Sequence, residues 1–217
     1  MDQHEVVTKT SDYVKTRLSG EGVGHDWWHI WRVWTMAKRI GREESADLFV
    51  VELAALLHDI SDWKFHGGDE SAGPKAAQAW LASLDVDEAA IAHVCEIIAE
   101  MSFKGAGTPS VMRTREGMVV QDADRLDALG AIGIARAFAY GGHKEREMHN
   151  PALQPVLHAS FEEYKKSEGT TINHFYEKLL LLKDRMNTGT GRQIAEGRHA
   201  VMEWYLARFF REWEGKA

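Results

Sequence analysis

The sequence is poor in cysteine, lacks long apolar runs and has fewer basic than acidic residues. Cys95 is the only cysteine, so a disulfide within the chain is excluded, and the apolar stretch 92–98 predicts that it is a small buried hydrophobe. No apolar run approaches the roughly 20 residues that a membrane-spanning helix requires. The first five residues lack the basic and then apolar layout of a signal peptide, so we expect a soluble cytoplasmic protein without membrane contact.

The formal net charge is -7 at pH 7. Proteins that bind polymeric nucleic acid normally present a basic face to the phosphates, so we expect no nucleic-acid polymer as a partner. A small anionic ligand is still compatible with this charge. A few local cations and a metal ion reverse the sign of the potential at one point of an acidic protein.

Apolar residues recur at helical spacing along most of the chain, and no segment shows the alternation of a strand. The sequence therefore predicts an all-α fold, a helical bundle formed by one domain over 1–217. In this domain a helical core at about 20–140 is packed by C-terminal helices at 155–215. The periodicity predicts helices at about 6–18, 28–40, 44–57, 74–84, 87–101, 118–140, 171–186 and 190–213.

The apolar run Leu53 to Leu57 ends in His58 and Asp59. Burying two such polar side chains unpaired costs several kcal/mol. A helix end that faces water would avoid this cost, and so would a divalent metal bound to both. Two further polar residues favour the metal, because His29 begins another amphipathic segment and Asp122 lies in a third.

His25 and His29 are four residues apart and would share a helix face if the helix began early enough. Both are therefore candidate metal ligands. The preceding Gly22-Val23-Gly24 turn favours His25 in the approach loop, where it could meet a substrate, and His29 in the first helical turn.

The stretch 121–127 contains three aspartates and Arg125, and a run of small residues at 128–135 follows it. Small residues let other helices approach closely, so we expect this helix to be buried with its acidic end at a site. Nearby aspartates repel one another unless a cation or Arg125 compensates them. We expect Asp122 to bind the metal.

Asp62 follows Asp59 by three residues, within one helical turn, and Lys64 brings a cation close to it. Both could be plain surface charges. Beside a metal site we favour a functional role for each.

Three segments, His29–Val33, Leu56–Ile60 and Gln121–Arg125, together resemble the spaced H…HD…D signature of the HD-domain metal-dependent phosphohydrolases. The segments 24–29, 121–135 and 174–180 resemble more narrowly a bacterial subgroup, the YpgQ/YedJ-like nucleotide pyrophosphohydrolases. The likeness covers nearly the whole chain.

This resemblance implies His29, His58, Asp59 and Asp122 as the protein ligands of one divalent transition metal in the centre of the bundle. Mn²⁺ is favoured, and Fe²⁺, Co²⁺, Ni²⁺, Zn²⁺ or Mg²⁺ are alternatives. Binuclear relatives carry two more histidines between the His-Asp pair and the last Asp. Since only His66 and His93 are available there, we expect a mononuclear site.

The resemblance also implies hydrolysis of (deoxy)nucleoside triphosphates to the monophosphate and pyrophosphate. Asp62 would be the catalytic residue that transfers a proton, and the substrate phosphates would be held by Lys64, His25, Arg32 and Arg125. Two alternatives stay open: a nucleoside monophosphate phosphatase of the 5′-nucleotidase type, and a non-catalytic metal-bound sensor or interaction module. Family behaviour suggests a homodimer.

Overall fold

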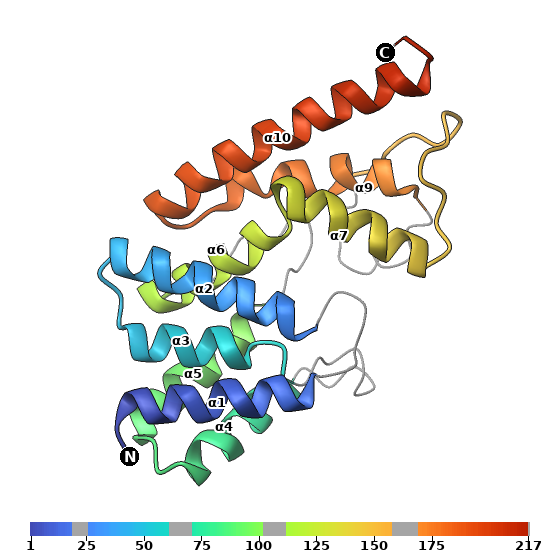
Figure 1. Ribbon diagram of the computed structural model, residues 1–217. Helices are drawn as coiled ribbons and strands as arrows, with labels where there is room; N and C mark the ends of the chain where they lie inside the picture. Colours follow the sequence, from blue (N-terminus) through green and yellow to red (C-terminus); the bar gives the residue numbers. More distant parts are fainter. Residues whose placement is uncertain (19–25, 61–70, 102–111, 158–168, 217) are drawn as a thin grey trace. The chain divides into compact units, whose positions relative to one another are not determined.

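A computed structural model of the chain describes residues 1–18, 26–60, 71–101, 112–157 and 169–216 (Figure 1). Every regular element in these ranges is a helix, either an α-helix or a short 3₁₀ helix, which confirms the all-α class. None of the described helices has both the length and the apolar character needed to cross a membrane. The described residues form two compact units, one of residues 1–18, 26–60, 71–101 and 112–123 and one of residues 124–157 and 169–216.

The first unit is built around its most apolar helix, α3. In α3 the side chains of Val50, Val51 and all five residues from Leu53 to Leu57 are buried, as expected of a central helix. Helices α1, α2 and α5 pack against α3, and α4 packs against α5 (Figure 1). The helices of this unit are α1 (Gln3–Arg17), α2 (Trp27–Glu43), α3 (Leu48–Leu57), α4 (Ala72–Ser83), α5 (Glu88–Glu100) and α6 (Arg115–Asp127), the last of which continues into the second unit.

Aspartate side chains begin several of these helices, because they accept hydrogen bonds from the free backbone N–H groups of the first turn. Asp47 accepts from Phe49, and Asp87 accepts from Ala89 and Ala90. Asp87 is therefore the cap of α5. The third helix begins later than the predicted residue 44, since α2 runs on to Glu43 and the chain then turns with Ser45 at a positive φ of 55°.

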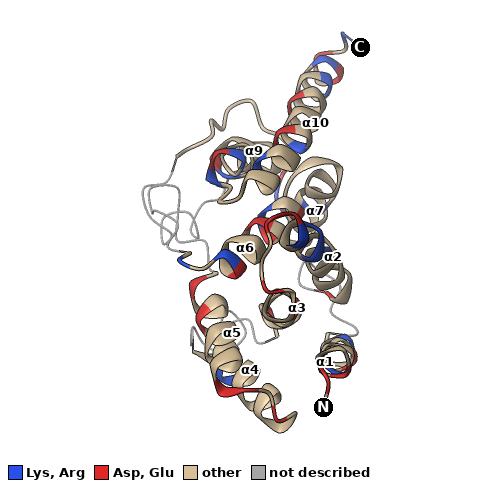
Figure 2. Ribbon diagram, turned by 90° about the vertical axis from the view of Figure 1, so that its left-hand side faces the viewer, with Lys and Arg blue, Asp and Glu red and all other residues tan. Residues whose placement is uncertain are grey.

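The second unit contains the end of α6 and the helices that follow it. Helix α7 (Gly130–His143) packs against α9 (Thr171–Glu177) and α10 (Gly189–Trp213), and two 3₁₀ helices, η2 (Leu179–Leu181) and η3 (Lys183–Arg185), lie between α9 and α10 in sequence. On each unit the basic and acidic residues are interspersed along the helices rather than gathered into one basic stripe (Figure 2).

The predicted single helix over 118–140 is wrong, because the structure breaks it into α6 and α7. The break falls in the run of small residues, where Gly130 adopts a φ of +71° that other residues rarely adopt. A Cβ atom on Gly133 would lie 2.2 Å from the carbonyl oxygen of Ala128. The glycines therefore allow a tight corner between two helices.

The predicted helix over 171–186 is also interrupted. Lys178 leaves helical geometry with φ −141° and ψ −58°, and the chain continues as η2 and η3. A 3₁₀ helix has three residues per turn, so residues three apart lie on one line. Leu179 and Leu182 have this spacing and both are buried, which gives these turns an apolar side.

Candidate metal centre

His29 lies in the first turn of α2 and is almost completely buried, with 2% of its surface exposed. Asp26 caps this helix, and its Oδ1 accepts a hydrogen bond from the backbone N–H of His29 at 2.9 Å. Ile30 and Val33 follow on the packed side of α2 and are fully buried. The sequence thus places this imidazole at a helix end whose interior face is fixed by the core.

His58 is the C-terminal cap of α3, and Asp59 follows it directly. The Nδ1 atom of His58 donates to the carbonyl oxygen of Ala55 at 2.9 Å. Because a carbonyl can only accept, this bond assigns the proton of the neutral ring to Nδ1 and leaves the lone pair of Nε2 available as a ligand. The imidazole of His58 and the carboxylate of Asp59 therefore lie next to each other at the C-terminal end of α3, and the hydrogen bond to Ala55 orients the imidazole.

The structure brings His29, His58 and Asp59 together. The Oδ2 atom of Asp59 lies 3.5 Å from Nε2 of His29 and 3.5 Å from Nε2 of His58. The ligand atoms of all three residues lie within 4.8 Å of one another, and the two imidazole rings meet edge to face with centroids 5.4 Å apart. We call these three residues the His-Asp cluster.

The His-Asp cluster fits a divalent metal. Ligand atoms about 2.1 Å from one ion lie about 3.0 Å apart at neighbouring octahedral positions and about 3.4 Å apart in a tetrahedron. The two measured distances of 3.5 Å are close to these values. Two imidazoles and a carboxylate are also a donor set that suits Mn²⁺, Fe²⁺, Co²⁺, Ni²⁺ and Zn²⁺.

Asp122, the fourth predicted ligand, lies on α6 in the same unit as the cluster and is fully buried. Its carboxylate is not among the ligand atoms that lie within 4.8 Å of one another. The structure thus assembles three of the four predicted ligands, and the role of Asp122 stays a prediction.

The other predicted site residues divide into two groups. His25, Asp62 and Lys64 lie outside the described residues, as does His66. Arg32 lies on α2, three residues after His29, and is partly exposed. Arg125 lies on α6, where its Nη1 donates to the backbone carbonyl of Arg185. This bond gives Arg125 a structural role within the second unit, and its predicted contact with phosphate is untested.

His93 lies outside the His-Asp cluster. Its Nε2 atom is 3.8 Å from a carboxylate oxygen of Glu116, whose other oxygen accepts from the backbone N–H of Asp47. Within the described residues the candidate ligands therefore form one cluster of three.

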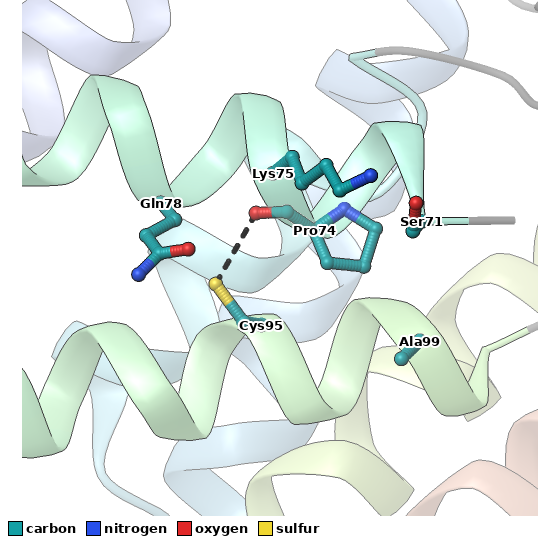
Figure 3. Close-up of a pocket in the computed structure, with 6 residues that line it drawn as sticks. All are labelled: Ser71, Pro74, Lys75, Gln78, Cys95 and Ala99. Atoms are coloured by element: carbon teal, nitrogen blue, oxygen red, sulfur yellow. Dashed lines mark hydrogen bonds between the residues drawn. The ribbon is translucent and has the colours of Figure 1, made fainter. Parts of the chain in front are cut away.

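The only cysteine lines a pocket of about 390 Å³ between α4 and α5 (Figure 3). Cys95 is partly rather than fully buried, and its thiol donates to the carbonyl oxygen of Pro74 at 3.4 Å. Burial raises the pKa of this thiol above its usual 9.0. A raised pKa disfavours the thiolate that a nucleophile needs. The sequence predicted a small buried hydrophobe at this position, whereas the structure leaves Cys95 partly exposed.

Sequence reasoning gave no role to two residues that hold the cluster in place. Asp26 could have been found, because an aspartate just before an amphipathic helix is a common cap. The carbonyl of Ala55 could not have been found from its residue type, since any residue at that position would offer the same backbone group.

The chain is similar to known proteins over nearly its whole length. A sequence model described as the HD domain matches residues 27–129. The uncharacterized protein YpgQ of Bacillus subtilis (strain 168) is 37% identical over 206 residues, which are 94% of this chain and 91% of YpgQ.

Several solved structures are also similar to this chain over nearly its whole length. A Lactobacillus plantarum protein has a TM-score of 0.86 and 37% identity, with 99% of this chain and 100% of that chain covered. An HD-superfamily hydrolase from Bacillus thuringiensis has a TM-score of 0.78 and 45% identity, with 98% and 99% covered. A structure of B. subtilis YpgQ in complex with ADP has a TM-score of 0.78 and 34% identity, with 98% and 97% covered.

The HD-domain match spans all three residues of the His-Asp cluster, and relatives that cover almost the full chain include a named HD-superfamily hydrolase. A divalent metal is the cofactor that this domain implies, and the cluster offers it three ligands of the right type. From this agreement of sequence, fold and local chemistry it follows that the chain belongs to the HD-domain superfamily of metal-dependent hydrolases.

Proposed function

We propose that this hydrolase cleaves (deoxy)nucleoside triphosphates to the monophosphate and pyrophosphate, with one Mn²⁺ held by His29, His58, Asp59 and Asp122. The observation that carries the proposal is the His-Asp cluster, whose ligand atoms already lie within 4.8 Å of one another. The ADP in the structure of YpgQ supports a nucleotide as the ligand class.

A divalent ion in this site would supply two effects, a lowered pKa for a bound water and compensation of the charge that develops on a phosphoryl oxygen. The chain's own groups have the remaining tasks. Asp62 would accept or return the proton of water or of the leaving group. Lys64, His25, Arg32 and Arg125 would hold substrate phosphates through charge-assisted hydrogen bonds.

The first experiment measures the metal before any substrate is chosen. We expect purified protein loaded with MnCl₂ and then desalted to carry about one equivalent of metal by elemental analysis. His58→Ala should lose it, because Nε2 of His58 is one of the three clustered ligand atoms. His93→Ala is the matched control, since it removes a histidine of the same unit that lies outside the cluster.

The second experiment identifies the products. Mn²⁺-loaded protein is incubated with deoxynucleoside triphosphates, nucleoside monophosphates and cyclic dinucleotides, and the products are separated by chromatography. Monophosphate and pyrophosphate from the triphosphates would support the proposal. Inorganic phosphate released only from monophosphates would identify a phosphatase instead, and no cleavage with any divalent ion would identify a sensor or interaction module.

We also propose that the protein is a homodimer. Family resemblance is the only support for this proposal. Light scattering coupled to gel filtration tests it, since a mass near twice the 24.5 kDa of one chain is expected and a mass near 24.5 kDa would contradict it.

A further inference from the structure

Asp26 is connected directly to a residue of the His-Asp cluster. Its side-chain Oδ1 accepts from the backbone N–H of His29 at 2.9 Å, and its own carbonyl oxygen accepts from the same N–H at 3.1 Å and from that of Ile30 at 3.3 Å. The backbone of Asp26 is extended, with φ −81° and ψ 169°, as an N-terminal cap requires. Among the side-chain caps of the described helices, it is the one that bonds to a cluster residue.

Two aromatic contacts lie on the solvent side of this turn, since Lys15 Nζ is 6.0 Å from the centroid of the Trp27 ring and the rings of Trp28 and Trp31 meet edge to face at 6.2 Å. Trp27 is partly exposed and Trp28 is 60% exposed. The first turn itself contains no acidic side chain that would interact favourably with the positive end of the helix dipole. On the other side, Ile30 anchors the helix in the core. His29 thus lies at the boundary between a packed helix and its exposed first residues, where the side chain of Asp26 adds a second acceptor for its N–H to the one that the backbone carbonyl of Asp26 provides.

We propose that Asp26 is a positioning residue for the metal centre. It holds the N–H of His29, closes the first turn of α2 and so keeps Nε2 of His29 facing Oδ2 of Asp59. When the cap is absent, part of the population has an open first turn, and the metal must order that turn as it binds. This inference rests on the proposed function, because it assumes that the His-Asp cluster binds a divalent ion.

The chain offers a matched control for this idea. Asp87 caps α5 in the same unit by accepting from two backbone N–H groups, but α5 carries no cluster residue. Asp26→Ala and Asp87→Ala therefore remove the same kind of interaction, the first from a helix that carries a cluster residue and the second from a helix that carries none. Asp26→Asn keeps a good cap and removes only the charge.

The experiment titrates metal-free wild type and the three variants with Mn²⁺ by calorimetry and follows amide hydrogen exchange at residues 27–30. We expect Asp26→Ala to bind Mn²⁺ about fivefold more weakly, the factor that corresponds to a lost cap of about 1 kcal/mol. Amide exchange at 27–30 should become faster in the same variant. Asp26→Asn should restore both values, and Asp87→Ala should leave both near wild type.

Each of the remaining possible results would contradict one step of this proposal. If Asp26→Ala binds Mn²⁺ as wild type does, Asp26 does not position the site. If Asp26→Asn binds Mn²⁺ as weakly as Asp26→Ala, the negative charge of Asp26 strengthens metal binding and its helix cap does not. If Asp87→Ala weakens binding equally, the effect is a general loss of stability. If wild type binds no divalent ion, the proposed function fails and this inference fails with it.

Discussion

His174 makes the folded protein sensitive to mild acid. Burial, followed by the positive charges of Lys178 and Arg146, lowers the pKa of this imidazole from 6.5 to about 3. As the pH falls below 6.5, the unfolded chain takes up a proton that the folded chain does not bind. The contribution of His174 to stability is therefore fully present above pH 6.5 and is lost as the pH falls towards 3.

The size of the effect follows from the two pKa values. A group of this kind changes the free energy of unfolding by at most about 1.4 kcal/mol per pH unit, and the linkage relation gives a loss of about 2 kcal/mol between pH 7 and pH 5. His174 keeps some exposure to solvent, which reduces the cost of its charge. We therefore expect a measured loss of about 1–2 kcal/mol over this interval.

Urea unfolding at pH 7 and pH 5 tests this, with EDTA present so that metal binding does not contribute. The quantity of interest is the change in unfolding free energy between the two pH values, which should be smaller in His174→Gln than in wild type by about 1–2 kcal/mol. His143→Gln, which removes an exposed histidine of the same unit, should leave that change as it is. Equal pH dependence in wild type and His174→Gln would refute the reasoning.

Three further variants test the packing of the second unit. Gly141→Ala should lower the melting temperature, because its new Cβ would lie 2.2 Å from Oγ1 of Thr171, whereas Gly142→Ala meets nothing within 4 Å and should raise stability by about 0.5–1 kcal/mol. A higher melting temperature for both variants would contradict the close approach of Gly141 to Thr171. Arg136→Ala should cost about 3 kcal/mol in urea unfolding at pH 7, because its guanidinium lies 2.7 Å from the buried carboxylate of Asp127 and the variant removes this ion pair from one side only. A cost below about 1 kcal/mol would show that the pair behaves like an exposed one.

Most helices were predictable because their signals are local. The apolar run of α3 is buried nearly all round, and Asp87 begins α5, where an aspartate supplies the missing hydrogen-bond acceptor. The corner at Gly130 was not predictable from the same information. The small residues before and after it permit a close approach of two helices as readily as a sharp turn between them, and Arg198 packing beside Gly130 is a contact between residues far apart in sequence.

The candidate site shows a similar division. His58 and Asp59 were recognisable because two polar groups end an apolar helix, and His29 because it follows a glycine turn. A sequence gives no distances between residues far apart in the chain. It therefore could not show that His29, His58 and Asp59 lie together while Asp122 is buried on α6 outside that group. Arg125 shows the same limit, since its charge suggested a phosphate contact and the structure gives it a backbone carbonyl of Arg185.

The three residues of the His-Asp cluster all lie at helix ends, and this location has a physical reason. Polar side chains in the middle of a buried helix would be costly to desolvate, so such a helix is apolar, as in Leu53 to Leu57. Polar ligand residues therefore lie at the helix ends, where the apolar run ends. Backbone groups at a helix end also lack partners within the helix and can be used to hold a ligand residue. Asp26 holds the N–H of His29, and the carbonyl of Ala55 in the last turn of α3 accepts from the ring of His58. The packed middles of α2 and α3 thus fix where the ligands are, and hydrogen bonds at their ends fix how the ligands point.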